Sequence, residues 1–460
     1  MSALLLLALS INAFVSCNNE NTVIQADDSS DDTTVQIEKK YDFEEAEFRI
    51  IGSNGALNNY PDEELTGDII NDTLTERDRI VSEKLNVKFK YTVAGDDEVA
   101  TLVKNSVLAQ ENEYDMLAGT AISLSKLGVN DVLLDILSVD TINTTSSEWS
   151  TLVAEGCQAN GKLFFLSGDI LPAFYTMPGC IFMNCDVASE YKITKDDVYK
   201  VIDSGKWTID QLAAYTKNTC SDIDDSGSIS SANDFIGYLS LKGELAAGVL
   251  AVGAGIHLCD ATKNGIKVDL MNERTLELID KAQILFGEYT VDAESDNLHK
   301  AFRENRVIFT QHYTSSAFTR YRDVEADFAI LPMPKLNEKQ ESYYSMLNPW
   351  GTAFIAFPNY ADTEYVGVVS QCMAEYSYEN LRPAVYESSF KVKGARDDES
   401  AKMLDLIFDN LYIDNNSIYN FGGSMTALSN SLFDGKEFSS AYASIESKIE
   451  ADIETLFKTE

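Results

Sequence analysis

Alternating strand-like and helix-like segments near the start of the folded part restrict the fold more than any other feature of the sequence. Residues 48–51 are a short apolar run stopped by a Gly/Ser/Asn turn, and residues 69–85 carry apolar side chains at helical spacing. Residues 87–93 alternate, 99–107 are helix-like, and 114–119 are again strand-like. Short connections between such segments are typical of βαβ units, so the sequence predicts an α/β fold with mostly parallel, doubly wound sheets.

The rest of the chain continues this mixed pattern. Further strands are predicted at 161–166, 180–185, 307–310, 327–332 and 353–357, and further helices at 208–212, 245–255, 276–286 and 440–457. Ligands of such sheets bind beyond the carboxyl ends of strands. Asn54 and Thr120 follow two predicted strands, so both are candidate ligand contacts, with helix capping as the alternative for each.

The N-terminal residues have the pattern of an export signal. The apolar run Leu4–Leu9 leads into Phe14-Val15-Ser16-Cys17, which resembles a bacterial lipobox, in which the cysteine is acylated and becomes the new N-terminus. We therefore expect a lipoprotein signal peptide at 1–17 with lipidation on Cys17; the alternative is an ordinary secretory signal. Residues 18–44 are mostly polar and predict a disordered tether, so the chain is expected on the outer face of the cell membrane.

Composition and charge exclude some partners. The 36 Lys and Arg residues against 74 Asp and Glu residues give a formal net charge of −38. A field of that sign repels phosphate backbones and anionic lipid surfaces, so neither nucleic acid nor an anionic membrane surface is an expected ligand. A length of 460 residues suggests two or three domains.

Several segments together resemble the family 1 extracellular solute-binding proteins of bacterial ABC importers. The resemblance covers roughly residues 45 to 460, and a subgroup likeness to sugar-binding lipoproteins comes from Glu64–Asp68 and Arg382–Glu387. Asn305 stands where the family usually has glycine. The segments that carry the resemblance are Tyr114–Gly119, Gly161–Leu166, Ile181–Asn184, Lys206–Leu212, Ala301–Val307 and Phe328–Pro334.

The resemblance implies a two-lobe fold of the type II periplasmic-binding-protein kind, with hinge segments that let the lobes close over a ligand. We expect residues 45–168 with 307–346 in an N-terminal lobe and 169–306 with 347–460 in a C-terminal lobe. The expected crossings lie near 167–178, 307–313 and 346–352. The implied function is capture of a small polar ligand, a sugar or oligosaccharide, by a monomer that presents it to permease subunits.

A sugar site needs aromatic faces for stacking and polar side chains for hydrogen bonds. Trp350, in a Pro-Trp-Gly turn at a crossing, is the first candidate; the alternative is a tryptophan that fills the core between the lobes. Tyr313 follows the 307–310 strand and Tyr175 lies in the first crossing. Asp169 is placed to accept from hydroxyls, with a hinge or turn role as the alternative. Trp207 is expected to pack in the core.

Residues 222–234 resemble the start of a calcium-binding loop. Asp222, Asp224, Ser226 and Ser228 occupy alternate positions, but the twelfth position is Asn233, so Asp234 would have to supply the final carboxylate. The alternative, an acidic surface turn, is favoured because the motif is incomplete. No other cofactor is expected.

An enzyme and a surface adhesin are the competing classes of function. None of the three histidines has metal-ligand spacing to another in the sequence, and the chain has no GxSxG, HExxH or P-loop motif. An adhesin would share the lipid anchor but not the two-lobe order of elements. We therefore expect a binding protein without catalytic activity.

Overall fold

The predicted βαβ series forms the first sheet of the structure, a computed structural model that describes residues 41–53, 55–57, 65–128, 131–262, 265–287, 295–390 and 398–456. Its strand order is β11-β3-β1-β2, in which β1 pairs parallel with both β2 and β3. β11 joins the edge antiparallel to β3, with Ala353 opposite Thr120. The strands are β1 (Ala46–Ser53), β2 (Val87–Ala94), β3 (Met116–Thr120) and β11 (Ala353–Ala356).

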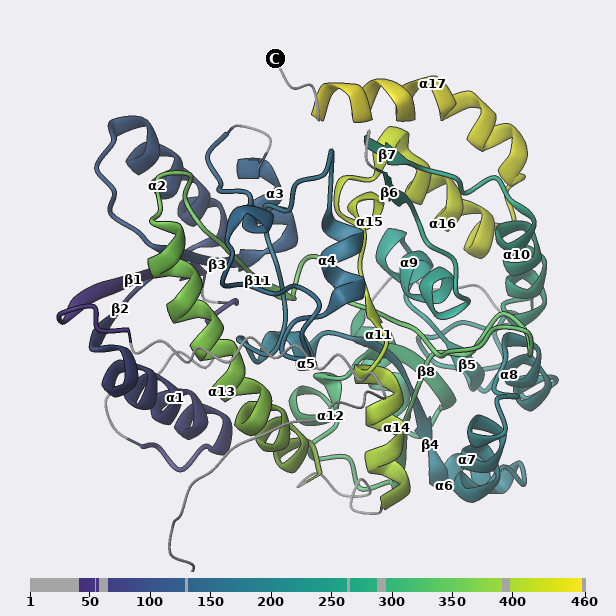
Figure 1. The fold of residues 1–460 in the computed structure, drawn as a ribbon. Helices are drawn as coiled ribbons and strands as arrows, with labels where there is room; N and C mark the ends of the chain where they lie inside the picture. The colour runs from purple at the N-terminus through teal and green to yellow at the C-terminus, as the bar shows by residue number, and fades with distance from the viewer. Residues whose placement is uncertain are drawn as a thin grey trace, which may run out of the picture. The chain divides into compact units, whose positions relative to one another are not determined.

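Helix α1 (Ile69–Leu85) has the predicted bounds because both of its ends carry capping residues. The Asp68 carboxylate accepts from the amides of Ile70 and Asn71 at 3.1 and 2.9 Å, and Asn86 ends the helix with φ 53°. The long helix α13 (Thr363–Phe390) lies beside α1 (Figure 1). The other helices next to this sheet are α2 (Asp96–Ala109) and α3 (Ala121–Gly128).

Arg77 forms a buried ion pair with its neighbour Asp78 on α1 and a hydrogen bond to the chain at Ile170. Arg77, only 2% exposed, donates from Nε to the Asp78 carboxylate and from Nη1 to the carbonyl of Ile170, both at 2.8 Å. The Tyr91 hydroxyl also donates to Asp78. Burial raises the pKa of the Asp78 carboxyl, and the Arg77 guanidinium opposes that rise.

The second sheet has the order β5-β8-β4-β9. β8 pairs parallel with β5 and antiparallel with β4, which pairs antiparallel with β9. Its strands are β4 (Gly179–Asn184), β5 (Ile236–Leu239), β8 (Val307–Tyr313) and β9 (Phe328–Leu331). Its larger helices are α6 (Cys185–Glu190), α7 (Lys195–Asp203), α8 (Ile209–Thr216), α9 (Glu244–Gly253), α10 (Glu273–Leu285) and α11 (Ser295–Arg303).

The C-terminal helices contact this second group. Helix α16 (Ser424–Asp434) lies beside α9, and helix α17 (Phe438–Leu456) packs against α16 (Figure 1). Near them, the amide of Asn415 donates to the Gly156 carbonyl at 3.1 Å, so the chain returns closely onto α4. The remaining elements are α4 (Thr151–Cys157), α5 (Ala173–Thr176), α12 (Ser316–Thr319), α14 (Asp398–Phe408), α15 (Asn415–Tyr419), α16 (Ser424–Asp434), α17 (Phe438–Leu456), two short 3₁₀ turns (Ile136–Ser138 and Phe421–Gly423) and the strand pairs β6 (Asp260–Thr262) with β7 (Gly265–Lys267) and β10 (Ser345–Met346) with β12 (Leu411–Tyr412).

Three sequence-based assignments differ from the structure. Strands β8 and β9, within the segment 307–346 expected in the first lobe, pair in the second sheet. β11, expected in the second lobe, pairs in the first sheet. The predicted strand at 161–166 makes only isolated bridges, such as Leu166 to Ile355. Backbone alternation identifies a strand but does not reveal its partner, because pairing depends on contacts far apart in the chain.

Most of the predicted elements are confirmed, and the fold class is as expected. Trp207 is fully buried and donates from Nε1 to the carbonyl of Pro332 at 2.9 Å, so its predicted packing role is confirmed. Thr208 caps α8 by accepting from the amide of Gln211. Within the described ranges, no helix combines the length and the apolar character that a bilayer crossing requires.

Candidate functional site

A cavity of about 470 Å³ lies where the chain crosses from β10 to β11, and Trp350 forms part of its wall. The indole of Trp350 is 62% exposed, whereas Trp149 and Trp207 are 3% and 0% exposed. Trp350 therefore does not fill a core, which rules out the alternative considered for it. The residues that line the cavity are Leu241, Lys242, Gly243, Glu244, Leu245, Ala246, Val249, Gln311, His312, Tyr313 and Trp350.

The start of helix α9 forms one side of this cavity. Gly243 is the N-cap, with φ 126° and ψ 179°, and it provides no side chain to bond the first amides of the helix. The first turn of any helix has backbone N–H groups without partners inside the helix. The residues Glu244, Leu245 and Ala246 thus present donors beside the cavity, suited to oxygen acceptors on a ligand.

The end of β8 forms the opposite wall. Gln311 is buried, and it accepts from the Tyr238 hydroxyl at 2.9 Å and donates to the Ala246 carbonyl at 3.1 Å. Because both ends of its amide are used, Gln311 holds β8 against α9 and fixes the width of the cavity. The Tyr313 ring, partly buried, lines the wall next to it, and burial raises the pKa of its hydroxyl.

His312 is the titratable side chain on the same wall. Its Nδ1 lies 2.6 Å from Ser316 Oγ, and its ring lies 4.5 Å from that of His299, centroid to centroid. Burial lowers the pKa of His312 to about 3, and that of His299 to about 4. His312 is therefore neutral at physiological pH, and its imidazole exchanges hydrogen bonds with neutral groups better than it attracts an anion.

The corner between β3 and α3 touches the turn that carries Trp350. The amide of Ile122 donates to the carbonyl of Pro349 at 3.3 Å. Thr120, buried at the end of β3, accepts on Oγ1 from the amide of Ser123 at 3.2 Å. Thr120 therefore caps α3, which was one of the two roles predicted for it, and its corner lies next to the Trp350 turn.

Two other predicted ligand residues, Asp169 and Tyr175, lie together at a different cavity of about 390 Å³. Both are buried, at 3% and 2% exposure. The structure thus groups Trp350 with Tyr313 and groups Asp169 with Tyr175, and does not bring all four to one cavity. Asn54 and Cys17 lie outside the described residues.

The acidic loop brings three carboxylates together. One carboxylate oxygen each from Asp222, Asp224 and Asp234 lies within 4.8 Å of the others. Asp222 and Asp224 both accept from the amide of Ser226 at 3.1 Å, and Asp234 accepts from the amides of Ile223 and Ser230 at 2.8 Å. The Ser226 hydroxyl donates to the Ser228 carbonyl. These contacts also describe a hydrogen-bonded acidic turn, so calcium binding by this loop stays a prediction.

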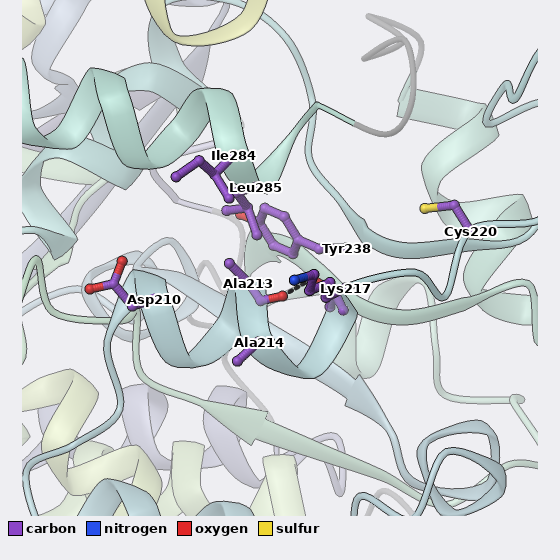
Figure 2. A pocket seen from close by; sticks show the side chains of 9 residues that line it. Asp210, Ala213, Ala214, Lys217, Cys220, Tyr238, Ile284 and Leu285 are labelled. Carbon is purple, nitrogen blue, oxygen red and sulfur yellow. Dashed lines mark hydrogen bonds between the residues drawn. The ribbon is translucent and has the colours of Figure 1, made fainter.

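A third cavity, of about 280 Å³, lies between α8 and α10 (Figure 2). Figure 2 shows Ile284 and Leu285 on one side, with Ala213 and Ala214 on the other. Tyr238 also lines this cavity, but its hydroxyl already donates to Gln311. Because its walls are mostly alkyl groups, this cavity has little to offer a polar ligand.

Sequence reasoning predicted the helix at 245–255, but it missed that the start of α9, together with Gln311 and His312, would line the Trp350 cavity. A signal existed in Lys242-Gly243-Glu244, where a glycine and an acidic residue precede an apolar helix, a pattern typical of a helix start. Gln311 and His312 directly precede Tyr313 on β8, and all three line the cavity. The sequence-based prediction named only Tyr313 from this strand end.

Comparison with known proteins finds similar folds among solved structures but no similar sequence among family models or curated proteins. No family model matches the sequence, and no curated protein matches it. Solved structures do match over nearly the whole chain. The maltose-binding protein MalE of Listeria monocytogenes in complex with maltose is 13% identical, with a TM-score of 0.57 over 90% of this chain and 100% of that one.

Two further neighbours have the same extent of likeness. The cyclic α-maltosyl-1,6-maltose binding protein of Arthrobacter globiformis is 12% identical, with a TM-score of 0.58 over 89% of this chain and 99% of its own. The galacto-N-biose/lacto-N-biose I-binding protein of the Bifidobacterium longum ABC transporter is 10% identical, with a TM-score of 0.58 over 89% and 97%.

The chain therefore has the two-lobe α/β fold of these binding proteins. This confirms the predicted α/β fold class. The first sheet is mostly parallel as expected, whereas two of the three strand pairings in the second sheet are antiparallel. At such low identity the likeness concerns the fold, and the function has to be argued from the chain's own cavity.

Proposed function

We propose that this protein is the extracytoplasmic solute-binding component of an ABC importer and that it captures a neutral sugar or oligosaccharide in the Trp350 cavity. The observation that carries the proposal is the exposed indole of Trp350 at the rim of a cavity with a second ring, Tyr313, on its wall. Exposed aromatic faces at a cavity suit the apolar faces of sugar rings.

The polar groups of the cavity support a neutral ligand. The free amides at the start of α9 donate to hydroxyl oxygens, and neutral His312 exchanges hydrogen bonds without demanding a charge. The ammonium of Lys242 is paired with Asp434, and Glu244 accepts from the Thr426 hydroxyl, so both nearby charges already have partners. The structural neighbours bind maltose, a cyclic tetrasaccharide or lacto-N-biose according to their names.

The test is calorimetric titration of residues 41–460 with maltose, maltotetraose, mannotriose and lacto-N-biose. A bound sugar should give saturable heat. Trp350→Ala should weaken the binding free energy by about 2 kcal/mol, roughly 30-fold in affinity, as expected for a tryptophan that the ligand covers on binding. Ile284→Ala, which removes a side chain 71% exposed at the Figure 2 cavity, is the matched control and should bind normally.

Two results would contradict the proposal. If no sugar binds, the carbohydrate assignment fails, and if Ile284→Ala rather than Trp350→Ala weakens binding, the site has been placed in the wrong cavity. Recovery of the sugar unchanged after incubation distinguishes a binding protein from the alternative, a secreted carbohydrate-active enzyme. Failure to bind sugar together with adhesion to a surface polymer would favour the adhesin.

We also propose that acylation of Cys17 anchors the protein to the membrane, with residues 18–40 as the tether, and that it acts as a monomer with permease subunits. The tether expected at 18–44 is shortened because residues 41–44 pack against the fold, where the Phe43 amide donates to the Leu85 carbonyl at 2.9 Å. Expression of the full chain and of Cys17→Ser, followed by separation of membranes, tests the anchor. The wild-type protein should sediment with membranes and the variant should not. Equal sedimentation would refute lipidation at this residue.

A further inference from the structure

The cavity of about 390 Å³ beside Asp169 is separate from the Trp350 cavity, and no residue lines both. It borders the chain crossing that leads to β4 and is closed by helix α13. Its walls combine hydroxyl groups with aromatic rings. The residues that line it are Thr145, Ser146, Ser147, Trp149, Ser150, Thr151, Leu152, Asp169, Phe174, Tyr175, Tyr378, Arg382, Phe408 and Asp409.

Asp169 is the unusual group in this cavity. Only 3% of its surface is exposed, and its Oδ1 has no hydrogen-bond partner in the described part of the chain. A buried carboxyl oxygen without a partner costs free energy comparable to a lost hydrogen bond or more. The backbone around it is fixed, because a Cβ on Gly168 would lie 2.5 Å from the Glu148 carbonyl oxygen. The Asp169 amide also donates to the Glu148 carbonyl at 3.1 Å, so the backbone that carries the carboxyl is held in place.

The charges around Asp169 leave an excess of carboxylates. Among the described residues that line the cavity, Arg382 on α13 is the one cation, and it already donates to Asp409 at 2.8 Å and lies 3.6 Å from Asp405. Glu148, buried next to Asp169 in the chain fold, accepts from the Ser146 hydroxyl at 2.6 Å and from Gln371. Negative charge is thus only partly balanced here, which favours a positively charged ligand.

Aromatic rings complete the chemistry of the cavity. Tyr175 packs edge-on against Phe408 at 5.0 Å between centroids, and Tyr378 is 37% exposed on α13. The Trp149 ring also lines the cavity, while its Nε1 donates to Gln371 at 2.9 Å. Ring faces next to a carboxylate are the usual environment of an ammonium group in a protein site.

We propose that this cavity is a second ligand site that takes a small organic ammonium ion, with its charge held by the Asp169 carboxylate and its carbon atoms against the aromatic rings. The proposal is independent of the sugar cavity. It accounts for an otherwise unfavourable group, because a bound ammonium supplies the hydrogen-bond partner that Asp169 Oδ1 lacks and the counter-charge that the ionised carboxylate requires.

The proposal has a proton-linked consequence. Burial, with a smaller contribution from Glu148, raises the pKa of Asp169 to about 8, and Arg382 opposes the rise. The titratable groups that face Asp169 are Glu148 before α4, Tyr175 on α5, Tyr378 and Arg382 on α13, and Asp409 after α14. At pH 7 the carboxyl is mostly protonated, so a bound cation should displace most of one proton into solution.

The probe is ethanolamine, which is a cation at pH 7, and the matched neutral compound is ethylene glycol. We expect ethanolamine to bind residues 41–460 saturably in calorimetry, with ethylene glycol at least tenfold weaker. Asp169→Asn should abolish ethanolamine binding, whereas Asp140→Asn, which removes the same charge from an exposed position, should retain it. Equal binding of the two compounds, or binding by Asp169→Asn, would overturn the proposal.

A second measurement needs no variant and so does not depend on how Asp169→Asn folds. Titration of the wild-type protein in two buffers with different ionisation enthalpies reports the number of protons released. Release of most of one proton supports binding at Asp169, and no release places the ammonium elsewhere and refutes the assignment. Because the probe contains no sugar, failure here leaves the carbohydrate proposal unaffected.

Discussion

Replacement of Gly243 by alanine would isolate a backbone cost at the edge of the Trp350 cavity. Gly243 has φ 126° and ψ 179°, in a region that is populated almost only by glycine. A Cβ at this position would meet no heavy atom within 4 Å. Steric crowding therefore contributes nothing, and the penalty comes from the backbone conformation alone, at about 1–3 kcal/mol.

Urea unfolding followed by circular dichroism measures this loss. We expect the Gly243→Ala midpoint to fall by an amount equivalent to about 1–3 kcal/mol with an unchanged m-value. Gly95 is a matched control because it is also a helix N-cap without a side-chain bond, but its φ is −71°. Gly95→Ala reports the general cost of alanine at an N-cap, about 0.5–1 kcal/mol.

The ligand gives a second measure of the same change. If the Gly243 peptide rotates to relieve the alanine, the first amides of α9 turn away from the cavity, and sugar affinity falls in Gly243→Ala but not in Gly95→Ala. A Gly243→Ala protein that is as stable as Gly95→Ala and binds sugar equally well would refute the reasoning, since the backbone would then tolerate a side chain without consequence.

Three further changes test packing and charge. Arg77→Met leaves Asp78 buried without its cation and should cost about 3–5 kcal/mol of unfolding free energy in urea titrations; a loss below 1 kcal/mol would contradict the pairing. Gly156→Ala places a Cβ 2.0 Å from the Ile413 carbonyl oxygen, so we expect a loss of about 1–3 kcal/mol or more and a lower thermal midpoint. The pKa of Asp169 is raised to about 8 by burial, so the folded state holds a proton that the unfolded chain releases above about pH 4. The free energy of unfolding of the wild-type protein should fall from that pH towards pH 8, by at most about 1.4 kcal/mol per pH unit. Asp169→Asn should flatten this slope, and equal slopes in the wild-type protein and the variant would contradict the raised pKa of Asp169.

Local elements were predictable from the sequence because their signals are local. The bounds of α1 follow from Asp68 and Asn86, whose capping preferences are visible in the sequence. The period-two alternation of 87–93 likewise located β2. Such signals depend on neighbours a few residues apart, which is the range over which capping and periodicity act.

The assembly of those elements was harder to predict, since it depends on pairs far apart in the chain. Nothing in residues 353–356 indicates that they pair with β3 rather than with β4. The segment 161–166 has the composition of a strand, yet the amide of Leu163 donates to the Asp135 carboxylate instead of to a neighbouring strand. A side-chain acceptor competes here with regular pairing, and composition does not reveal it.

The candidate site was predicted only in part, because its residues come from segments that lie far apart in the chain. Trp350 and Tyr313 were chosen because aromatic residues at an expected crossing or strand end are recognisable in the sequence, and the structure places both at one cavity. The glycine at 243 was not, because a glycine before a helix has many possible roles, and its positive φ is known only once the strand β5 and the helix α9 have been placed.

The antiparallel strand β11 also affects the order in which the protein can fold. Its residues pair with β3, so the edge of the first sheet is complete only when Ala353 has paired with Thr120. As the chain is synthesised from its N-terminus, the early part must remain without this strand until most of the protein has been made. Contacts of such long sequence separation slow folding. A delay of this kind suits the export proposed above, because export of an unfolded polypeptide requires a chain that has not yet closed its first sheet.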